Sequence, residues 1–323
     1  MMSDLIVFSG SANRPLAQGI CQWLKIPLGE ALVGRFKNGE TRIKIEQNVR
    51  NMDVFVIQPT SNPSDHHIME LLIMIDALRR ASAARITAVI PYYGYAKQEK
   101  KTAGREPISA KLVANLITTA GADRVVALDL HAPAIQGFFD IPVDNLTAIP
   151  ILADELMETE GQDHIVVVSP DAGGVARAYD FRNRVGAGFA LIAKHRPEPD
   201  TNEVLEMVGD VEGKTAVIVD DMISTGGTLA EAAYMLIERG ARQVMAYAVH
   251  PVFAGDAMER IHHSMLDRVV VTNTIEVPPE FRDGKVQVLD ISALIAQAIR
   301  RIHEGSSVSA LFEAMRYRQE QLI

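Results

Sequence analysis

One segment of the sequence places two adjacent carboxylates directly before a loop of hydroxyl and glycine residues. Residues 217–228 read VIVDDMISTGGT, and a helical pattern follows in residues 229–239. Glycines let backbone N–H groups turn toward an anion, and the start of a helix favours negative charge. The loop therefore suits a phosphate and the acids suit a vicinal diol or a divalent metal, which together predict a phosphorylated ribose. The acids are Asp220 and Asp221, and the loop residues are Ser224, Thr225, Gly226, Gly227 and Thr228.

Two common phosphate-binding motifs are absent from this segment. No Gly-Lys-Ser or Gly-Lys-Thr follows the glycines, as a nucleotide-binding P-loop requires, and the Gly-x-Gly-x-x-Gly fingerprint is also missing. An ordinary turn between a strand and a helix is the alternative interpretation. The acid pair and the three hydroxyls favour a sugar-phosphate site over such a turn.

Single polar residues also follow two other apolar strands. His131 comes just after Asp129, and Asp171 precedes the glycine pair Gly173 and Gly174. Ligands bind beyond the carboxyl ends of strands in parallel sheets, so His131 and Asp171 are candidates for a metal or phosphate contact. The alternatives are a structural role for His131 and a helix N-cap for Asp171.

Three further segments carry cations or aromatic residues in polar surroundings. Residues 194–199 read KHRPEP, and Lys194 and Arg196 could neutralise charge in a phosphoryl-transfer transition state. A solvated surface loop is the alternative. Residues 91–101 read PYYGYAKQEKK, where tyrosines and cations suit an adenine and a polyphosphate. Residues 36–40 read FKNGE, where an aromatic ring and a turn suit a base.

These residues need a scaffold that brings strand ends together. Short β-branched runs alternate with helical patterns, which predicts an α/β fold of mainly parallel sheets flanked by helices. The predicted strands are Leu5–Phe8, Val54–Gln58, Ile86–Ile90, Arg124–Asp129, Ile165–Ser169, Ala190–Ala193, Ala216–Val219, Gln243–Val249 and Arg268–Val271. The predicted helices include Arg14–Leu24, His67–Ala81, Ile108–Ala120, Leu229–Arg239, Leu294–His303 and Val308–Arg318.

The length of 323 residues predicts two domains rather than one core. A weak repeat supports this, because residues 121–127 (GADRVVA) lead to His131 and residues 240–246 (GARQVMA) lead to His250. Chance similarity between two helix–strand units is the alternative. We predict an N-terminal α/β domain at residues 1–147. The C-terminal α/β domain, at residues 148–323, would contain the sugar-phosphate loop.

Composition argues against several classes of protein. The formal charge of −9 argues against non-specific nucleic-acid binding, which needs a basic face. The single cysteine, Cys21, precludes an internal disulfide and fits a buried thiol in a reducing compartment. No leader is visible, and no apolar run reaches membrane-spanning length. We therefore expect a cytoplasmic protein with neither nucleic-acid nor membrane partners.

Taken together, these segments resemble the ribose-phosphate pyrophosphokinase family, whose members synthesise phosphoribosyl diphosphate. The resemblance covers nearly the whole chain and is most specific at residues 91–98, 129–144, 169–177 and 219–228. It implies two similar α/β domains of phosphoribosyltransferase type. It also implies a Mg²⁺-dependent enzyme of nucleotide biosynthesis, in which ribose 5-phosphate attacks the β-phosphorus of ATP and AMP leaves.

The resemblance implies roles for the residues of the sugar site and the charged loop. Asp220 and Asp221 would hold the ribose diol and its metal, and residues 224–228 would bind the 5-phosphate. Lys194 and Arg196 would be the catalytic cations that stabilise the transferring diphosphoryl group.

The resemblance also implies metal and nucleotide contacts. His131 and Asp171 would be associated with Mg²⁺ and the ATP phosphates. The residues that would line the ATP site are Phe36, Asn38, Gly39, Glu40, Lys97 and Gln98. In known members a neighbouring subunit contributes part of that site, which implies a homo-oligomer, commonly a hexamer.

An effector site is a further implication of the resemblance. Relatives with this type of C-terminus are often activated by phosphate and inhibited by ADP at a subunit interface. The residues that resemble parts of that site are Arg50, Ser82, Ser307, Ser309 and Phe312. Capping of the final helix by Ser306 and Ser307 is the alternative.

Four positions depart from the usual pattern of the family. Ser224 and Asn38 stand where aspartate is usual, whereas Lys97 and His195 stand where arginine is usual. Two other functions are alternatives to synthesis of the diphosphate. A non-catalytic regulatory relative would be expected to lose the loop cations or metal ligands, which this chain keeps. A phosphoribosyltransferase would share the loop at residues 220–228 but would not explain the ATP-like segments.

Overall fold

The described chain, residues 4–160, 164–195, 204–282 and 284–311 of a computed structural model, forms two compact units. Unit 1 contains the described residues up to Thr147, residues 274–276 and the described residues from Asp290 onward. Unit 2 contains the described part of residues 148–273 and 277–289. The division after Thr147 lies at the predicted position. The structure corrects the assignment of residues 148–323 to one domain, because the last described helix belongs to unit 1.

Unit 1 is built on a five-stranded sheet in the order β1-β4-β5-β6-β7, and every neighbouring pair is parallel. The strands are β1 (Leu5–Ser9), β4 (Asp53–Ile57), β5 (Arg85–Ile90), β6 (Arg124–Leu128) and β7 (Val143–Leu146). Parallel sheets are buried on both faces, and the apolar runs of β4, β5 and β6 meet this requirement because nearly all their residues are buried. The predicted parallel α/β architecture is confirmed here.

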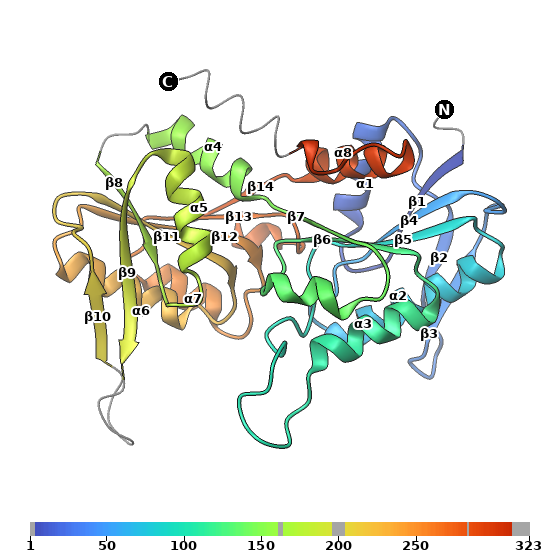
Figure 1. Cartoon of the computed structure of the whole chain (residues 1–323), viewed down its shortest axis with the longest axis horizontal. Helices are drawn as coiled ribbons and strands as arrows, with labels where there is room; N and C mark the ends of the chain where they lie inside the picture. The colour runs from blue at the N-terminus through green and yellow to red at the C-terminus, as the bar shows by residue number, and fades with distance from the viewer. Residues whose placement is uncertain (1–3, 161–163, 196–203, 283, 312–323) are drawn as a thin grey trace. The chain divides into compact units, whose positions relative to one another are not determined.

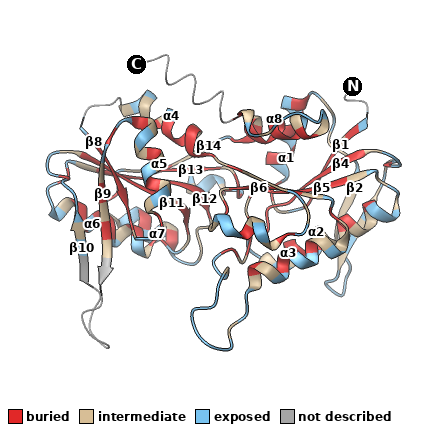
Figure 2. Ribbon diagram, viewed as in Figure 1, coloured by how far each residue is buried: buried red, intermediate tan, exposed pale blue. Residues whose placement is uncertain are grey.

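Helices cover both faces of this sheet, and Figure 2 shows the buried residues gathered on the strands and the inner helix faces. Helices α2 (Ser64–Arg80) and α3 (Ser109–Ala120) share one core with the strands. Helices α1 (Arg14–Leu24) and α8 (Ser292–His303) lie side by side on the other face (Figure 1). A short 3₁₀ helix, η2 (Pro133–Phe138), connects β6 to β7.

Helix α8 joins unit 1 because it carries one continuous apolar face. The buried apolar residues of this face recur at helical spacing and are Leu294, Ile295, Ala298, Ile299 and Ile302. Gly19 of α1 permits the close contact between the two helices, since a β-carbon at Gly19 would lie 2.4 Å from Ser292 Oγ. The apolar face is visible in the sequence, but its partner at the opposite end of the chain is not.

A polar cluster fastens the end of α8 to the sheet of unit 1. Arg85 Nε of β5 donates to Asp53 Oδ1 of β4 over 2.8 Å, and Arg85 Nη2 donates to the carbonyl oxygen of Ile302 over 3.1 Å. His303 Nδ1 lies 2.8 Å from Asp53 Oδ2. Two adjacent strands and the C-terminal helix therefore meet at one carboxylate.

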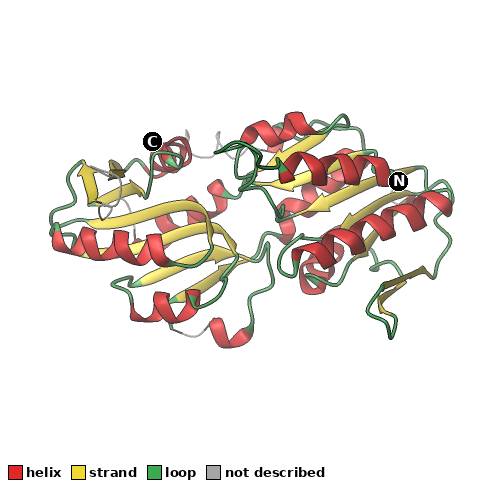
Figure 3. Ribbon diagram, turned by 90° about the horizontal axis from the view of Figure 1, so that it is seen from below, coloured by secondary structure: helices red, strands yellow, loops and turns green. Residues whose placement is uncertain are grey.

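An antiparallel hairpin stands apart from the five-stranded sheet (Figure 3). It consists of β2 (Ala31–Arg35) and β3 (Thr41–Ile45), and it packs against α2. The partly buried apolar residues that attach it to the core are Ala31, Val33, Ile43 and Ile45. The hairpin was not predicted from the sequence because its strands are short and half-exposed, and therefore lack a continuous apolar run.

Unit 2 is built on a seven-stranded sheet in the order β10-β9-β8-β11-β12-β13-β14. The strands are β8 (Ile165–Ser169), β9 (Gly188–His195), β10 (Val204–Val208), β11 (Thr215–Ile223), β12 (Gln243–Pro251), β13 (Arg268–Thr272) and β14 (Val286–Leu289). Neighbouring strands are parallel except for the antiparallel pair β9 and β10.

The helices of unit 2 cover this second sheet. Helices α6 (Gly227–Glu238) and α7 (Ala257–His263) share one core with the strands. Helix α4 (Ile149–Glu160) packs on α5 (Val175–Val185), and α5 in turn packs on β8 and β11. The 3₁₀ helix η3 (Pro279–Phe281) precedes β14.

The two units share a topology, but the sequence repeat does not mark it. Five parallel strands follow one another in chain order in both sheets, as β1-β4-β5-β6-β7 and as β8-β11-β12-β13-β14. Strand β12 therefore corresponds to β5. The repeat instead paired residues 121–127, which lead into β6, with residues 240–246, which lead into β12. The sequence similarity between these two segments is thus a coincidence between two helix–strand units that are not equivalent.

The predicted strands and helices occur within a few residues of their predicted ends. The exception is helix Val308–Arg318, which lies largely outside the described residues. Besides the hairpin, the strands that were missed are β7, β10 and β14, and the helices that were missed are α4 and α7, whereas α5 is the helix expected after the glycine pair Gly173 and Gly174. Strands β7 and β14 are edge strands and are only partly buried, whereas α7 is short, with Ala257 and Ile261 as its buried residues.

The packing of α8 predicts which parts of the protein a cavity beneath this helix would destabilise. Ile299→Ala removes a fully buried side chain and should cost about 2–5 kcal/mol of stability. Native-state hydrogen exchange should show faster exchange in α1 and the sheet of unit 1, with unit 2 unchanged. Leu112→Ala, at a side chain that is 58% exposed on α3, is the matched control and should have little effect. Faster exchange confined to unit 2 would contradict the assignment of α8 to unit 1.

Candidate active site

The strand order of unit 2 changes direction next to β8. From β8 the chain passes through α5 to β9 on one side, whereas β11 lies on the other side of β8. Ligands of parallel α/β sheets commonly bind beyond the carboxyl ends of strands at such a switch point. Asp171 follows β8, and Asp220 and Asp221 lie near the end of β11. The fold therefore brings these three predicted residues to neighbouring strand ends.

The acid pair lies inside β11 rather than after it, because the strand extends four residues beyond its predicted end. The side chain of Asp220 is 33% exposed and that of Asp221 only 3% exposed. The backbone N–H of Asp221 donates to Asp220 Oδ1 over 2.8 Å. One carboxylate thus reaches the surface of the site while the other is held beneath it.

Arg177, which the sequence analysis did not single out, is the counter-ion of this pair. It lies in the first part of α5, and its Nη1 is 3.0 Å from Asp220 Oδ1 and 3.4 Å from Asp221 Oδ1. The only signal for Arg177 in the sequence is its position shortly after Asp171 and the two glycines. Nothing local indicates its contact with residues 43 and 44 positions further along the chain.

The environment of Asp220 disfavours its charged form. Burial, and then the neighbouring charge of Asp221, raise the pKa of Asp220 to about 7, and Arg177 opposes this rise. Perturbed carboxylates of this kind are typical of functional sites, although structural ion pairs also produce them. The pair therefore suits a ligand that donates hydrogen bonds or carries positive charge.

The predicted phosphate loop joins β11 to α6. Gly226 has φ +73°, a left-handed conformation that favours glycine, and its β-carbon would come within 3.3 Å of the carbonyl oxygen of Ala257. Helix α6 begins at Gly227, so its first N–H groups have no partner within the helix. Thr225 and Thr228 are exposed. The loop therefore presents hydroxyls and helix-terminal N–H groups to an anion.

A second arginine missed by the sequence analysis lies beside this loop. A β-carbon placed on Gly227 would be only 3.1 Å from Nη1 of Arg260, which lies on α7. Arginine pairs favourably with phosphate oxygens. The charge of Arg260 therefore adds to the suitability of the loop for a phosphate.

Asp171 has a structural role that the geometry shows directly. Its Oδ1 accepts from the backbone N–H of Gly174 over 2.9 Å, and Ser169 Oγ donates to its carbonyl oxygen over 2.7 Å. These contacts shape the turn that leads into α5, much as the capping alternative supposed. A metal role for Asp171 stays a prediction.

The donor set around the switch point fits Mg²⁺. Mg²⁺ is usually bound through one or two carboxylates together with substrate phosphates, and Asp171, Asp220 and Asp221 supply such oxygens. Within the described ranges, no three His, Cys, Asp or Glu side chains converge as a metal-binding group. His131, the other predicted ligand, follows β6 in unit 1. The structure thus places the two predicted metal contacts, His131 and Asp171, in separate units.

Unit 1 contains a hollow of about 450 Å³ after the ends of β4 and β5. Lys97 and Gln98, two of the predicted ATP residues, line it together with Tyr92 and Tyr95. Gln98 is held in place because its Oε1 accepts from Ser109 Oγ over 2.6 Å. Aromatic rings beside a cation and an amide suit a purine with phosphates, as the sequence analysis expected.

The other four predicted ATP residues lie at the tip of the β2–β3 hairpin and do not line that hollow. Phe36 is 51% exposed, with the Arg42 guanidinium 5.5 Å from its ring centre. Asn38 Oδ1 accepts from the backbone N–H of Glu40 over 3.2 Å, and Gly39 has φ +90°. The tip is therefore an ordered turn that presents an aromatic ring to solvent within this chain.

The predicted loop cations lie at the limit of the described residues. Lys194 is the penultimate residue of β9, where it pairs with Leu205 of β10. Arg196 lies outside the described residues. Their predicted catalytic roles stay predictions.

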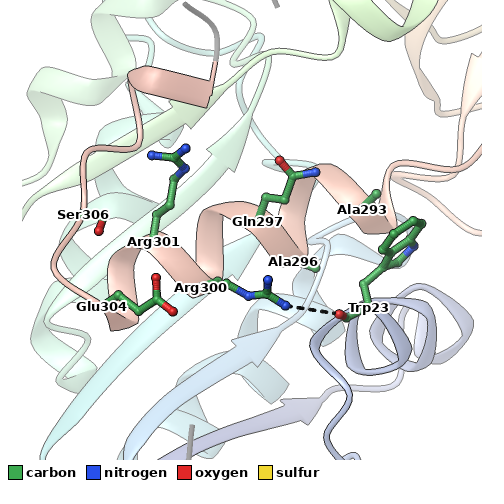
Figure 4. A pocket seen from close by; sticks show the side chains of 8 residues that line it. All are labelled: Trp23, Ala293, Ala296, Gln297, Arg300, Arg301, Glu304 and Ser306. Carbon is green, nitrogen blue, oxygen red and sulfur yellow. Dashed lines mark hydrogen bonds between the residues drawn. The ribbon is translucent and has the colours of Figure 1, made fainter. Parts of the chain in front are cut away.

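A second hollow of unit 1, of about 500 Å³, lies between α1 and α8 and contains none of the predicted catalytic or substrate-binding residues (Figure 4). Its polar lining includes Arg300 and Arg301, and Trp23 forms one wall. Arg301 donates to the carbonyl oxygen of Ser307 over 2.9 Å, which ties α8 to the segment that follows it.

Two predicted effector residues come close together in unit 1. The backbone N–H of Asn51, next to Arg50, donates to the carbonyl oxygen of Ser82 over 2.9 Å. Ser307 and Ser309 follow α8, and Phe312 lies outside the described residues. The effector role of this group stays a prediction.

Cys21 is a packing residue of α1. It is buried, and burial raises the pKa of its thiol to about 11, so the reactive thiolate is disfavoured. This confirms the expectation of a buried cysteine rather than a nucleophile. In the described portion of the chain, no helix combines the length and apolar character needed to cross a membrane.

Comparison with known proteins identifies the family. The N-terminal domain of ribose phosphate pyrophosphokinase matches residues 5–121, and the phosphoribosyl synthetase-associated domain matches residues 193–313. The ribose-phosphate pyrophosphokinases of Bacillus cereus and Bacillus subtilis are 53% and 52% identical to the chain. These matches cover 96% of this chain and 98% and 97% of the relatives. The chain belongs to the ribose-phosphate pyrophosphokinase family.

A solved structure agrees with this assignment to the ribose-phosphate pyrophosphokinase family. The crystal structure of phosphoribosylpyrophosphate synthetase from Mycobacterium smegmatis matches with a TM-score of 0.90 and 42% sequence identity. The match covers 94% of this chain and 100% of that chain. The family resemblance inferred from separate motifs is thus confirmed over nearly the full length, and the protein is an enzyme of this family, a transferase.

The raised pKa of Asp220 predicts a pH-dependent cost to stability. Native Asp220 keeps its proton up to about pH 7, whereas an unfolded aspartate loses it near pH 4. Native stability should therefore fall as the pH rises from about 4 through 7. Asp220→Asn removes this loss, so its melting temperature should exceed that of the wild type increasingly between pH 5 and pH 8, measured by circular dichroism in metal-free buffer.

Asp210→Asn is the matched control for this measurement. Asp210 is exposed, and its hydrogen bond with Lys214 lowers its pKa, so its substitution should leave the slope between pH 5 and pH 8 unchanged. An identical slope for the wild type and Asp220→Asn would show that Asp220 is already ionised in the native protein at pH 5.

Proposed function

We propose that this enzyme transfers the β,γ-diphosphoryl group of ATP to the 1-hydroxyl of ribose 5-phosphate. The reaction requires Mg²⁺ and yields AMP and 5-phosphoribosyl 1-diphosphate for nucleotide biosynthesis. The observation that carries the proposal is the arrangement of two carboxylates beside a hydroxyl- and glycine-rich loop at the switch point of unit 2. Membership of the ribose-phosphate pyrophosphokinase family supports the same reaction.

The sugar site orients ribose 5-phosphate from both ends. Residues 224–228 bind the 5-phosphate with hydroxyls and N–H groups, and Arg260 lies close enough to add its charge. Asp220 and Asp221 accept hydrogen bonds from the two ring hydroxyls. Holding the sugar at two points fixes the direction of its 1-hydroxyl, and this positioning lowers the entropic part of the barrier.

The chemical step is a displacement at the β-phosphorus of ATP. The 1-oxygen of the sugar forms a bond to the β-phosphorus, the bond from that phosphorus to the α,β-bridging oxygen breaks, and the hydroxyl proton is lost to water. AMP leaves with the bridging oxygen. No covalent bond to the protein is required, so catalysis comes from positioning and charge neutralisation.

Mg²⁺ is the proposed cofactor, and its carboxylate ligands come from unit 2. Asp220 and Asp221 would hold the metal that accompanies the ribose diol, and we propose that His131 and Asp171 would be associated with Mg²⁺ and the ATP phosphates. When bound, Mg²⁺ supplies positive charge that stabilises the transferring phosphates. Lys194 and Arg196 would add further positive charge to the same group.

The nucleotide site supports a proposal of self-association. Lys97 and Gln98 line a hollow of unit 1 that the hairpin tip with Phe36, Asn38, Gly39 and Glu40 does not complete. We propose that the exposed tip of one chain serves the ATP site of another in a homo-oligomer, with a hexamer as the expected form. Phosphate and ADP are the proposed effectors at the group that includes Arg50 and Ser82. The single reduced cysteine supports a cytoplasmic location.

Phosphorus NMR of the purified protein with ATP, ribose 5-phosphate and Mg²⁺ tests the proposed reaction. We expect AMP to appear together with the signals of a ribose-linked diphosphate, because the β,γ-diphosphoryl group moves as one unit. ADP as the sole nucleotide product would show ordinary γ-phosphoryl transfer and overturn the proposal. Release of pyrophosphate from phosphoribosyl diphosphate only when a base is added would instead indicate a phosphoribosyltransferase.

The proposed role of Lys194 predicts a selective loss of turnover. Lys194→Ala should lower kcat by a factor on the order of 10²–10³, because it removes charge stabilisation that is needed mainly in the transition state. The KM for ribose 5-phosphate should change less than threefold. Lys214→Ala is the control, since Lys214 pairs with Asp210 away from the site and should keep full activity. Unchanged turnover in Lys194→Ala would refute the assigned role.

A further inference from the structure

Arg177 connects the two segments that meet at the switch point of unit 2. It belongs to α5, which follows the Asp171 turn, and its side chain reaches the acid pair of β11. The side chain of Arg177 is only 17% exposed although it carries a full charge. A cation this buried is positioned by its partners, and here the partners are the two carboxylates of the proposed sugar site.

The backbone that carries Arg177 is itself fixed. Asp171 holds the N–H of Gly174, and α5 begins at Val175, so Arg177 lies in the first turn of an anchored helix. Helix α5 also packs on β8 and β11. The guanidinium thus approaches the acid pair from a rigid element rather than from a loop.

The contacts of Arg177 determine how the carboxylates lie. Its Nη1 is within 3.4 Å of an oxygen of each acid, and the N–H of Asp221 donates to the same oxygen of Asp220 that Arg177 contacts. Two adjacent carboxylates repel each other, and the repulsion is strong where water is excluded. Arg177 offsets this repulsion and keeps the partly exposed carboxylate of Asp220 next to the buried carboxylate of Asp221.

We propose that Arg177 is the positioning residue of the sugar site, holding Asp220 and Asp221 in the paired arrangement that reads the vicinal diol of ribose 5-phosphate. Arg177 thereby makes the site prefer ribose to 2-deoxyribose. This inference rests on the proposed function. A site that pairs two acceptors with two hydroxyls discriminates against a sugar that lacks one of them, because the hydrogen bond from the missing hydroxyl is lost. Without the guanidinium the acids separate, and the loss of one hydroxyl matters less.

The test compares ribose 5-phosphate with 2-deoxyribose 5-phosphate on three variants. Arg177→Met removes the charge, and Arg177→Lys keeps the charge but loses the planar fork. Arg182→Met is the matched control, because Arg182 lies on the same helix and contacts Tyr179 and Asn183 instead of the acids. Binding of each sugar phosphate is measured by saturation-transfer NMR, and kcat/KM is measured at fixed ATP and Mg²⁺.

We expect the wild type and Arg182→Met to prefer the ribose compound by at least tenfold in both measurements. Arg177→Met should reduce this preference to below threefold, with the KM for ATP changed less than twofold. Arg177→Lys should retain an intermediate preference. If Arg177→Met does not fold, the result for Arg177→Lys decides, and a preference equal to that of the wild type would overturn the proposal.

The outcomes separate this inference from the proposed function. If the wild type binds neither sugar phosphate and makes no diphosphate product, the proposed function fails. If the wild type is active and selective but Arg177→Met keeps the full preference and loses only thermal stability, Arg177 is a structural ion-pair residue and this inference fails. Equal binding of both sugars by the wild type would also overturn the inference, because the site would then not recognise the 2-hydroxyl of ribose 5-phosphate.

Discussion

The burial of two neighbouring carboxylates within one strand is the constraint on which the site of unit 2 depends. Like charges side by side in a partly dry environment are costly, and the raised pKa of Asp220 records that cost. Arg177 offsets part of it from a separate helix. The strand order, the Asp171 turn and the start of α5 together deliver that guanidinium to the acids. The burial of the acid pair thus lowers the stability of the protein locally, but it provides two carboxylates to which a sugar or a metal can bind.

The rest of the fold supplies rigid supports for short functional segments. Each sheet of parallel strands ends in turns that carry the candidate residues, and the turns are fixed by hydrogen bonds of their own, such as those made by Asp171 and Gln98. The β2–β3 hairpin differs because it extends from the core and presents Phe36 to solvent. The hairpin tip therefore does not line the hollow that contains Lys97 and Gln98, whereas the acid pair and the glycine-rich loop belong to one unit.

Much of the fold and of the candidate site could be predicted from the sequence wherever a local sequence pattern determines the structure. Apolar β-branched runs revealed the buried central strands, and the acid pair with its loop indicated the proposed sugar site. Edge strands and the hairpin were missed because half-exposed strands carry little apolar signal. Arg177 and Arg260 were missed because their partners are distant in sequence and only the fold brings them together. The sequence repeat was a poor guide to the fold because its two copies lead into β6 and β12, which occupy different positions in their sheets.

The return of α8 to unit 1 has a consequence for the order in which the protein is made. Because Asp290 and the residues of α8 belong to unit 1, unit 2 is an insertion within the chain of unit 1. During synthesis the sheet of unit 2 is complete once β14 has left the ribosome. The apolar face of α1, made long before, stays uncovered until α8 emerges. Unit 2 can therefore finish folding first, and unit 1 is completed only after α8 has emerged.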